Sequence, residues 1–202
     1  MKKINTVILD IGKVLVDFDW MSYIKKLGYT DEVNEQLGKY IFRSNGWRER
    51  DRGAKSEEEY IEDFVELAPH LEKEIRRVFE NITDIVEEYS YTNEFVKSLK
   101  DQGMKVYLLS NYSKKSFEAD SQRYTFLPYV DGGVISYEVK FLKPEKEIYQ
   151  FLLEKYDINP ERAVFLDDLE ENLEGARAFG IETIHVTSHE KAVEGLQKLG
   201  VL

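Results

Sequence analysis

The sequence predicts an α/β fold in which a parallel sheet lies between two layers of helices and a helical block is inserted after the first strand. Residues 4–9 contain a short apolar run that is typical of a buried strand, and from residue 93 onward strand and helix patterns alternate to the end of the chain. Such alternation gives right-handed crossovers between parallel strands. Helical patterns, rather than a second strand, follow Leu15 and extend over residues 20–90, which are therefore predicted to be the insertion.

The first predicted strand ends at an acidic residue. Val7-Ile8-Leu9, preceded by Ile4, is apolar without alternation, as in strands that are buried on both faces. Asp10 and Gly12 follow it. Asp10 should therefore lie at the carboxyl end of a central strand, where open α/β sheets bind their ligands. Taken alone, Asp10 is better explained as a residue that closes the strand or begins a turn.

The insertion is predicted to contain three helices, at residues 31–43, 57–68 and 71–79. The second has the clearest ends, because Ser56 is a favourable N-cap, Glu59 completes a capping box and Pro69 stops the helix. The third helix is charged on one face and apolar on the other.

Residues 45–53, between the first two of these helices, are predicted to be a loop. The segment holds Trp47 and three arginines, Arg48, Arg50 and Arg52. Two interpretations remain open for it. It is either a solvated turn with a packed tryptophan or a surface that faces a substrate.

The second half of the chain is predicted to hold four more strands with helices between them. Thr92 or Asn93 can cap a helix that ends at Gly103, and Pro144 occupies a favoured first position of another helix. The predicted strands are residues 105–109, 130–135, 163–166 and 181–186. A helix at residues 144–156 follows the strand at 130–135, a helix that ends at Gly180 follows the strand at 163–166, and a helix at residues 188–199 follows the last strand.

Composition narrows the class of function. The 202 residues carry a formal net charge of -11, which disfavours nucleic acid and anionic membrane surfaces as partners. The absence of cysteine excludes disulfides, thiolate catalysis and cysteine metal sites. No apolar run approaches the ~18 residues of a membrane span. We expect a soluble cytoplasmic protein, whose oligomeric state the sequence leaves open.

Polar residues follow three predicted strands at what should be one edge of the sheet: Asp10, Ser110-Asn111 and Asp167-Asp168. Lys143 directly precedes a predicted helix. Carboxylates from different strands, without histidine or cysteine, suit an oxygen-liganded cation such as magnesium and disfavour zinc. A hydroxyl, an amide and an ammonium suit the oxygens of a phosphate. Each residue alone also fits a cap, a turn or a solvated side chain, but their order and placement together favour a site.

These residues, in this order, resemble the four motifs of the haloacid dehalogenase superfamily: Asp10-Ile11-Gly12, Ser110-Asn111, Lys143-Pro144, and Asp167-Asp168 followed by Asn172. The resemblance covers nearly all of the chain. It implies a Rossmann-like core of residues 1–18 and 91–202, with a small helical cap domain of residues 19–90. Residues 10–17 and 165–172 also resemble the sugar-phosphate phosphatases that include α-glucose-1-phosphate phosphatase.

The resemblance implies a role for each motif residue. Asp10 would be the nucleophile that forms an aspartyl-phosphate, and Lys143 would offset the charge repulsion between that carboxylate and the phosphate. The predicted magnesium ligands are the carboxylates of Asp10 and Asp168 and the backbone carbonyl of Gly12, with Asp167 in support. The predicted substrate-binding groups are Ser110, Asn111 and Lys143 at the phosphate, and Trp47 and Arg50 in the insertion.

The sequence departs from the superfamily pattern at Gly12. Most phosphatases of the superfamily carry at this position a second aspartate, which protonates the leaving oxygen and later activates water. General acid–base catalysis typically contributes roughly 10²- to 10⁴-fold, so either another group supplies it here or turnover is slow. Asp17, Asp19 and the segment around Glu49 are the candidates in the sequence.

The implied function is a magnesium-dependent phosphatase of a small phosphorylated metabolite, with a sugar phosphate as the expected substrate. A cap over the site would exclude a folded phosphoprotein. Two alternatives remain. One is a metal-independent, dehalogenase-like hydrolase in which Asp10 attacks carbon. The other is a protein that binds a phosphorylated ligand without turnover, because Gly12 replaces the acid/base residue.

Overall fold

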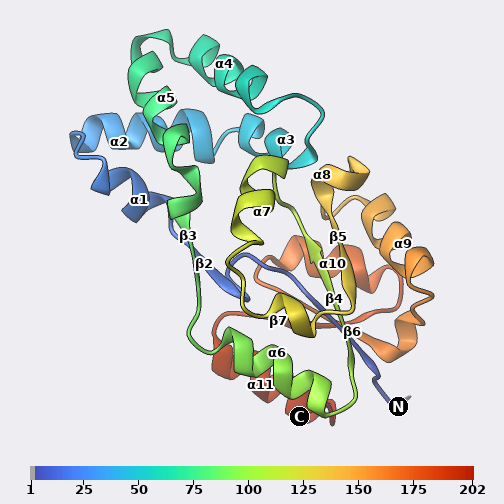
Figure 1. Ribbon diagram of the computed structural model, residues 1–202. Helices are drawn as coiled ribbons and strands as arrows, with labels where there is room; N and C mark the ends of the chain where they lie inside the picture. Colours follow the sequence, from blue (N-terminus) through green and yellow to red (C-terminus); the bar gives the residue numbers. More distant parts are fainter. Residues whose placement is uncertain (1–2) are drawn as a thin grey trace.

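The computed structural model describes residues 3–202 and contains a five-stranded parallel sheet with helices on both faces (Figure 1). The strand order is β5-β4-β1-β6-β7. The strands are β1 (Thr6–Leu9), β4 (Lys105–Ser110), β5 (Gly132–Ile135), β6 (Ala163–Asp167) and β7 (Glu182–His185). The predicted α/β class is confirmed. Met1 and Lys2, which belong to the predicted core, lie outside the described residues.

Helices bury both faces of this sheet. The covering helices are α6 (Thr92–Asp101), α9 (Lys146–Lys155), α10 (Glu170–Arg177) and α11 (His189–Lys198). Two shorter helices, α7 (Lys114–Asp120) and α8 (Ser136–Val139), follow β4 and β5 at the carboxyl end of the sheet. Successive residues of β1 point to opposite faces: Val7 and Leu9 belong to the apolar cluster that includes α6 and α11, and Ile8 belongs to the cluster of α9 and α10. Burial on both faces explains why β1 is continuously apolar.

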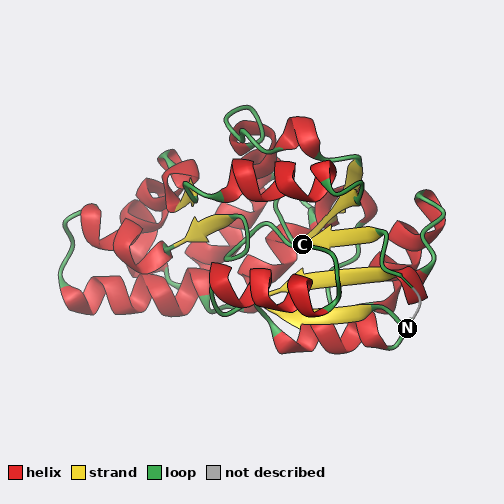
Figure 2. Ribbon diagram, turned by 90° about the horizontal axis from the view of Figure 1, so that it is seen from below, coloured by secondary structure: helices red, strands yellow, loops and turns green. Residues whose placement is uncertain are grey.

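A second group of helices lies beyond one end of the sheet, as Figures 1 and 2 show. These are α1 (Trp20–Lys26), α2 (Asp31–Leu37), α3 (Asn45–Arg52), α4 (Glu57–Leu67) and α5 (Glu72–Glu80), and α2 continues as a π-helical turn, Gly38–Phe42. Short 3₁₀ turns cover Pro69–Leu71, Ile82–Ile85, Leu127–Tyr129 and Pro160–Arg162. The division into a core and a cap of residues 19–90 stays a prediction.

The predicted loop at residues 45–53 is wrong, because this segment forms α3. The Ser44 side chain accepts a hydrogen bond from the backbone N–H of Trp47 at the start of the helix, and Gly53 ends it with a left-handed φ of 68°. Both are favourable helix caps. The segment is almost entirely polar, so no apolar periodicity marked it as a helix.

The expectation of helix alone after Leu15 is also wrong. Val16–Phe18 (β2) pairs antiparallel with Val86–Glu88 (β3), and this ribbon connects the sheet to α1–α5. Each strand has three residues, which is too short for a periodic signal. The two strands can pair because the segments that enter and leave the helical insertion lie side by side.

Two predicted helix starts need correction. Thr92 begins α6, but its hydroxyl donates to the backbone oxygen of Leu15 at 2.6 Å and does not cap the helix. Helix α9 begins at Lys146, two residues after Pro144, because residues 142–145 form a turn that the Glu145 N–H to Leu142 oxygen hydrogen bond of 2.7 Å closes. Among the described residues, no helix has the length and apolar character that a membrane span requires.

Candidate active site

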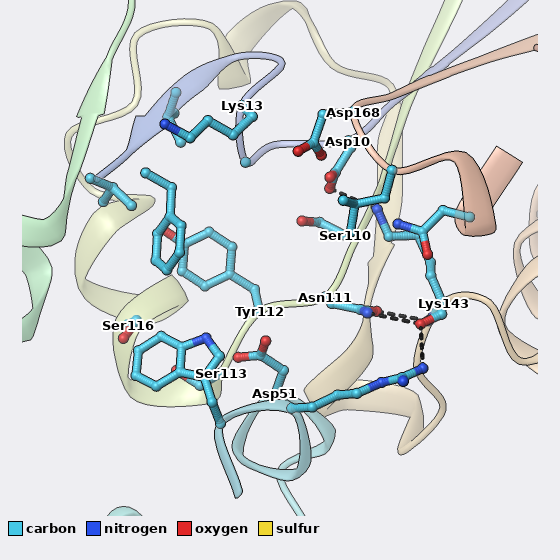
Figure 3. Close-up of a pocket in the computed structure, with 18 of the residues that line it drawn as sticks. Asp10, Lys13, Asp51, Ser110, Asn111, Tyr112, Ser113, Ser116, Lys143 and Asp168 are labelled. Atoms are coloured by element: carbon cyan, nitrogen blue, oxygen red, sulfur yellow. Dashed lines mark hydrogen bonds and ion pairs between the residues drawn. The ribbon is translucent and has the colours of Figure 1, made fainter. Parts of the chain in front are cut away.

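The strand register brings the predicted site residues to one edge of the sheet. Leu9 of β1 is level with Leu108 of β4 and Leu166 of β6, so the residues at and just beyond the carboxyl ends of these three strands lie close to one another. They are Asp10, Ser110-Asn111 and Asp167-Asp168. From β1 the chain builds the sheet outward through β4 and β5, and it then returns to the other side of β1 to add β6 and β7. The gap between β1 and β6 is therefore the topological switch point, where open α/β sheets bind their ligands. A cavity of about 280 Å³ opens here, and Figure 3 shows side chains from both the sheet edge and the insertion around it.

Lys143 connects two of the carboxylates. Its Nζ lies 2.8 Å from Oδ1 of Asp10 and 2.6 Å from Oδ2 of Asp167, and the lysine is 2% exposed. Asn111 fixes the backbone of this lysine: its Oδ1 accepts from the Lys143 N–H at 2.8 Å, and its Nδ2 donates to the Lys143 oxygen at 3.1 Å. The ammonium is therefore held beside Asp10 before any ligand arrives.

The three aspartates differ in how many of their oxygens are already engaged. Asp167 is fully buried and accepts hydrogen bonds from Lys143 and from the Leu169 N–H, and both of its oxygens accept from Nδ2 of Asn172. Asp168 is partly exposed to the cavity. Asp10 accepts from the Ile11 N–H at 2.7 Å in addition to Lys143. Asp167 thus orients Lys143, and Asp10 and Asp168 keep oxygens for a ligand.

The electrostatics of this cluster favour a bound cation. Burial raises the pKa of Asp10 to about 7, and Asp167 and Asp168 add to this increase while Lys143 opposes it. Burial and the neighbouring Asp167 raise the pKa of Asp168. Burial alone would lower the pKa of Lys143, but Asp10 and Asp167 outweigh it and the net direction is upward, so the ammonium stays charged. Three acidic groups share one ammonium, and one oxygen atom of each lies within 4.8 Å of the others. A hard divalent cation with oxygen ligands, such as magnesium, fits these donors.

Ser110 and Gly12 complete the sheet edge. Ser110 is 1% exposed at the last position of β4 and lines the cavity, as does Gly12. A Cβ atom at Gly12 would meet no atom within 4 Å outside its chain neighbours, and the φ of Gly12 lies outside the left-handed region. The backbone therefore does not require glycine at this position.

The family follows from a direct comparison. A family model described as haloacid dehalogenase-like hydrolase matches residues 4–180. The chain belongs to this family. The resemblance of its motifs to the haloacid dehalogenase superfamily is confirmed, and the protein is a hydrolase.

Three relatives show how far the similarity extends. Sesquiterpene phosphatase AstK of Aspergillus oryzae is 26% identical over 183 residues, which are 91% of this chain and 90% of that protein. A phosphorylated carbohydrates phosphatase of Thermotoga maritima is 28% identical over 130 residues, 64% of this chain and 59% of that protein. Acyl-CoA dehydrogenase family member 10 of Mus musculus is 28% identical over 165 residues, which are 77% of this chain but only 15% of that protein.

A solved structure supports the same assignment. A HAD family enzyme of Bacteroides thetaiotaomicron, in complex with magnesium and inorganic phosphate, is 25% identical to this chain with a TM-score of 0.69. The match covers 89% of this chain and 92% of that chain. Relatives and structural neighbours of this hydrolase therefore include phosphatases and a magnesium-binding enzyme.

The residues predicted in the insertion have different surroundings in the hydrolase. Trp47 lines the cavity and packs on Phe42, with ring centroids 4.8 Å apart. Arg50 is 2% exposed; its guanidinium donates to both oxygens of Glu57, at 2.9 and 2.7 Å, and to Ser116. These contacts leave Arg50 little capacity for a substrate, and its binding role stays a prediction. Arg48, from the same segment, lines the cavity and donates to the Lys143 oxygen at 3.2 Å.

The acid/base candidates from the sequence already have partners. Asp17 pairs with Lys13 at 2.6 Å, and Asp19 caps α1 by accepting from the Ser22 N–H at 2.9 Å. Glu49 pairs with Arg52 at 2.9 Å. None of the three carboxylates belongs to the described residues that line the cavity.

Sequence reasoning missed Asp51, which does line the cavity. Asp51 lies four residues after Trp47 on α3, so the two share one face of the helix. The signal was present in the sequence: Ser44 and Gly53 are typical cap residues for a helix between them, and that helix places Trp47, Arg48 and Asp51 together.

Proposed function

We propose that this hydrolase is a magnesium-dependent phosphatase of a small phosphorylated metabolite. The observation that carries the proposal is the convergence of Asp10, Asp168 and Lys143 on one cavity that, among the described residues, no histidine or cysteine lines. Such a site offers a carboxylate nucleophile and oxygen ligands for a hard cation. The magnesium and phosphate in the Bacteroides thetaiotaomicron neighbour support this interpretation.

The proposed reaction has two steps at Asp10. One carboxylate oxygen attacks phosphorus and releases the alcohol, which leaves an aspartyl-phosphate, and water then attacks phosphorus to release phosphate. Lys143 holds Asp10 in place through the 2.8 Å contact and offsets the negative charge of the transferring group. Asp167 keeps the ammonium directed toward that position.

Other side chains would bind the phosphate and the metal. The Ser110 hydroxyl and the Asn111 backbone, at the end of β4, would hold phosphate oxygens. Magnesium, when bound by Asp10, Asp168 and the Gly12 carbonyl, would supply positive charge beside the phosphate. The oxygens that Asp10 and Asp168 keep for a ligand support this set.

The leaving group is proposed to be a sugar. The cavity of about 280 Å³ suits a small molecule, and Trp47 offers an aromatic face beside the cationic Arg48. The phosphorylated carbohydrates phosphatase among the relatives agrees with a sugar. A second candidate is an apolar alcohol, since Phe18, Ile85 and Val86 also line the cavity and one relative is a sesquiterpene phosphatase.

Two matched monoesters test the substrate class. Cyclohexylmethyl phosphate has nearly the shape of glucose 6-phosphate but no ring hydroxyls. With magnesium present, we expect the wild-type protein to release phosphate from both, with a higher kcat/KM for glucose 6-phosphate, measured as inorganic phosphate. A preference for cyclohexylmethyl phosphate would select the apolar class instead. Release from neither these nor an aryl phosphate would contradict phosphatase activity itself.

The Trp47→Ala variant extends this test to the insertion. Because the indole would contact the leaving group and not the phosphate, its loss should lower kcat/KM for glucose 6-phosphate more than for methyl phosphate. A uniform loss for both substrates would mean that Trp47 only supports the packing of Phe42 and Phe18.

A further inference from the structure

The cavity contains a carboxylate that the proposed steps do not use. Asp51 enters from α3, on the side opposite the sheet edge, and Figure 3 shows its side chain pointing into the cavity that Asp10 lines from the other side. Attack by Asp10 on phosphorus places the leaving oxygen on the far side of the phosphorus, away from the sheet. The leaving group and the Asp51 carboxylate therefore share the same half of the cavity.

Several contacts fix α3 on the core and set the position of Asp51. The Ser136 hydroxyl donates to the backbone oxygen of Asp51 at 2.5 Å, and Arg52 donates to Glu145 at 2.7 Å and to the Lys140 oxygen at 3.1 Å. Lys140 in turn donates to the Gly53 oxygen. The end of α3 is thus attached to residues 136–145, the segment that also carries Lys143.

The Asp51 carboxylate is not used in a structural ion pair and is therefore available for proton transfer. Among residues 3–202 it makes no ion pair, and it accepts a hydrogen bond from the Ser113 backbone. Burial raises the pKa of Asp51 to about 7; Arg50 opposes this, and Glu57 and Asp10 add to it. A carboxyl group with such a pKa can donate and accept a proton near neutral pH.

The neighbouring Ser113 side chain supplies a second, independent observation. Its hydroxyl is buried, lines the cavity and has no hydrogen-bond partner among the described residues. An unsatisfied buried polar group costs free energy unless a ligand or water binds it. The hydroxyl therefore marks a place beside Asp51 for a polar atom of the substrate or for the attacking water.

We propose that Asp51 is the general acid and base of this hydrolase and performs the role for which Gly12 has no side chain. This inference rests on the proposed phosphatase function. In the first step the Asp10–phosphorus bond forms, the bond from phosphorus to the leaving oxygen breaks, and the Asp51 carboxyl gives its proton to that oxygen. In the second step the Asp51 carboxylate takes a proton from water, the water oxygen bonds to phosphorus, and the Asp10–phosphate bond breaks.

The Asp51→Asn variant tests the assignment with two substrates. An alkyl phosphate such as cyclohexylmethyl phosphate needs an acid for departure, so its kcat/KM should fall by about 10²-fold or more. p-Nitrophenyl phosphate has a good leaving group, so the variant should release one equivalent of nitrophenol in a burst and then turn over slowly. Intact mass should show phosphate accumulating on the variant, whereas the wild type shows no burst.

A restored carboxylate gives a second readout. Gly12 has open space and an unstrained φ, so Gly12→Asp in the Asp51→Asn background should remove the burst and recover part of the alkyl phosphate activity. Asp63→Asn, which neutralises a 40%-exposed carboxylate of α4, is the matched control and should behave as wild type. Thermal melts check folding, and Asp51→Ser repeats the test if Asp51→Asn is unstable.

Equal losses for both substrates, without a burst or a phosphorylated protein, would overturn the assignment and make Asp51 a binding residue. Failure of the wild type to release phosphate from these two substrates and from glucose 6-phosphate would instead refute the proposed function. The wild-type measurement therefore distinguishes the two failures.

Discussion

Asp10→Asn should abolish phosphate release while the protein stays folded. The substitution removes the attacking charge, and loss of a nucleophile commonly costs about 10⁴-fold or more in kcat. Asparagine keeps the shape and an oxygen that can accept from the Ile11 N–H. Replacing a buried carboxylate whose pKa is raised to about 7 also removes a group that burial disfavours in its charged form. Phosphate release and a thermal melt by circular dichroism measure the two halves of this prediction.

The control for this variant is again Asp63→Asn, which removes an acidic charge outside the cavity. Near-wild-type turnover in Asp10→Asn would show that Asp10 is not the nucleophile. A variant that fails to fold would show that Asp10 is chiefly structural.

Lys143→Met should lower the free energy of unfolding by about 3 kcal/mol at pH 8, since breaking a buried ion pair leaves uncompensated charge. Asp10 and Asp167 would lose the ammonium that lies 2.8 and 2.6 Å away. Without it, folding favours the protonated form of Asp10, so the folded-state pKa of Asp10, which burial already raises to about 7, rises further above the unfolded value. Stability is then retained at low pH and lost as pH rises through the raised pKa. Urea unfolding at pH 5 and pH 8 should show the larger loss at pH 8.

The same variant should also lose catalysis, because the group that orients Asp10 is gone. A stability loss of equal size at both pH values would contradict this explanation and indicate a packing defect instead. Lys146→Met is a useful control, since Lys146 begins α9 only three residues further along the chain and lies outside the cavity.

The sheet could be predicted from the sequence because each central strand is a short apolar run with a polar residue at its end. Val7 to Leu9 and Val164 to Leu166 are buried on both faces, and that burial is what makes the pattern continuous. Helix α3 could not be predicted by periodicity. It is stabilised by its caps and by contacts of Arg50 and Arg52 with other segments.

Some residues of the candidate site could be predicted from the sequence and others could not. Asp10, Asp167 and Asp168 follow strands that the sequence revealed, so their convergence could be anticipated. The surroundings of Arg50 and Asp51 depend on the rotation of α3. Both residues line the cavity, but the Arg50 guanidinium is paired with Glu57. A residue-by-residue interpretation of a loop could not have given that rotation.

Magnesium dependence tests the proposed function most directly. Inorganic phosphate released from p-nitrophenyl phosphate should be measured for the wild type and for Asp168→Ala across a range of magnesium concentrations, and with EDTA. We predict that wild-type turnover saturates with magnesium, disappears in EDTA and returns when magnesium is restored, and that Asp168→Ala requires far more magnesium because one ligand is missing. Full turnover of the wild type in EDTA, with Asp168→Ala equally active, would contradict the magnesium-dependent phosphatase and favour a metal-independent hydrolase.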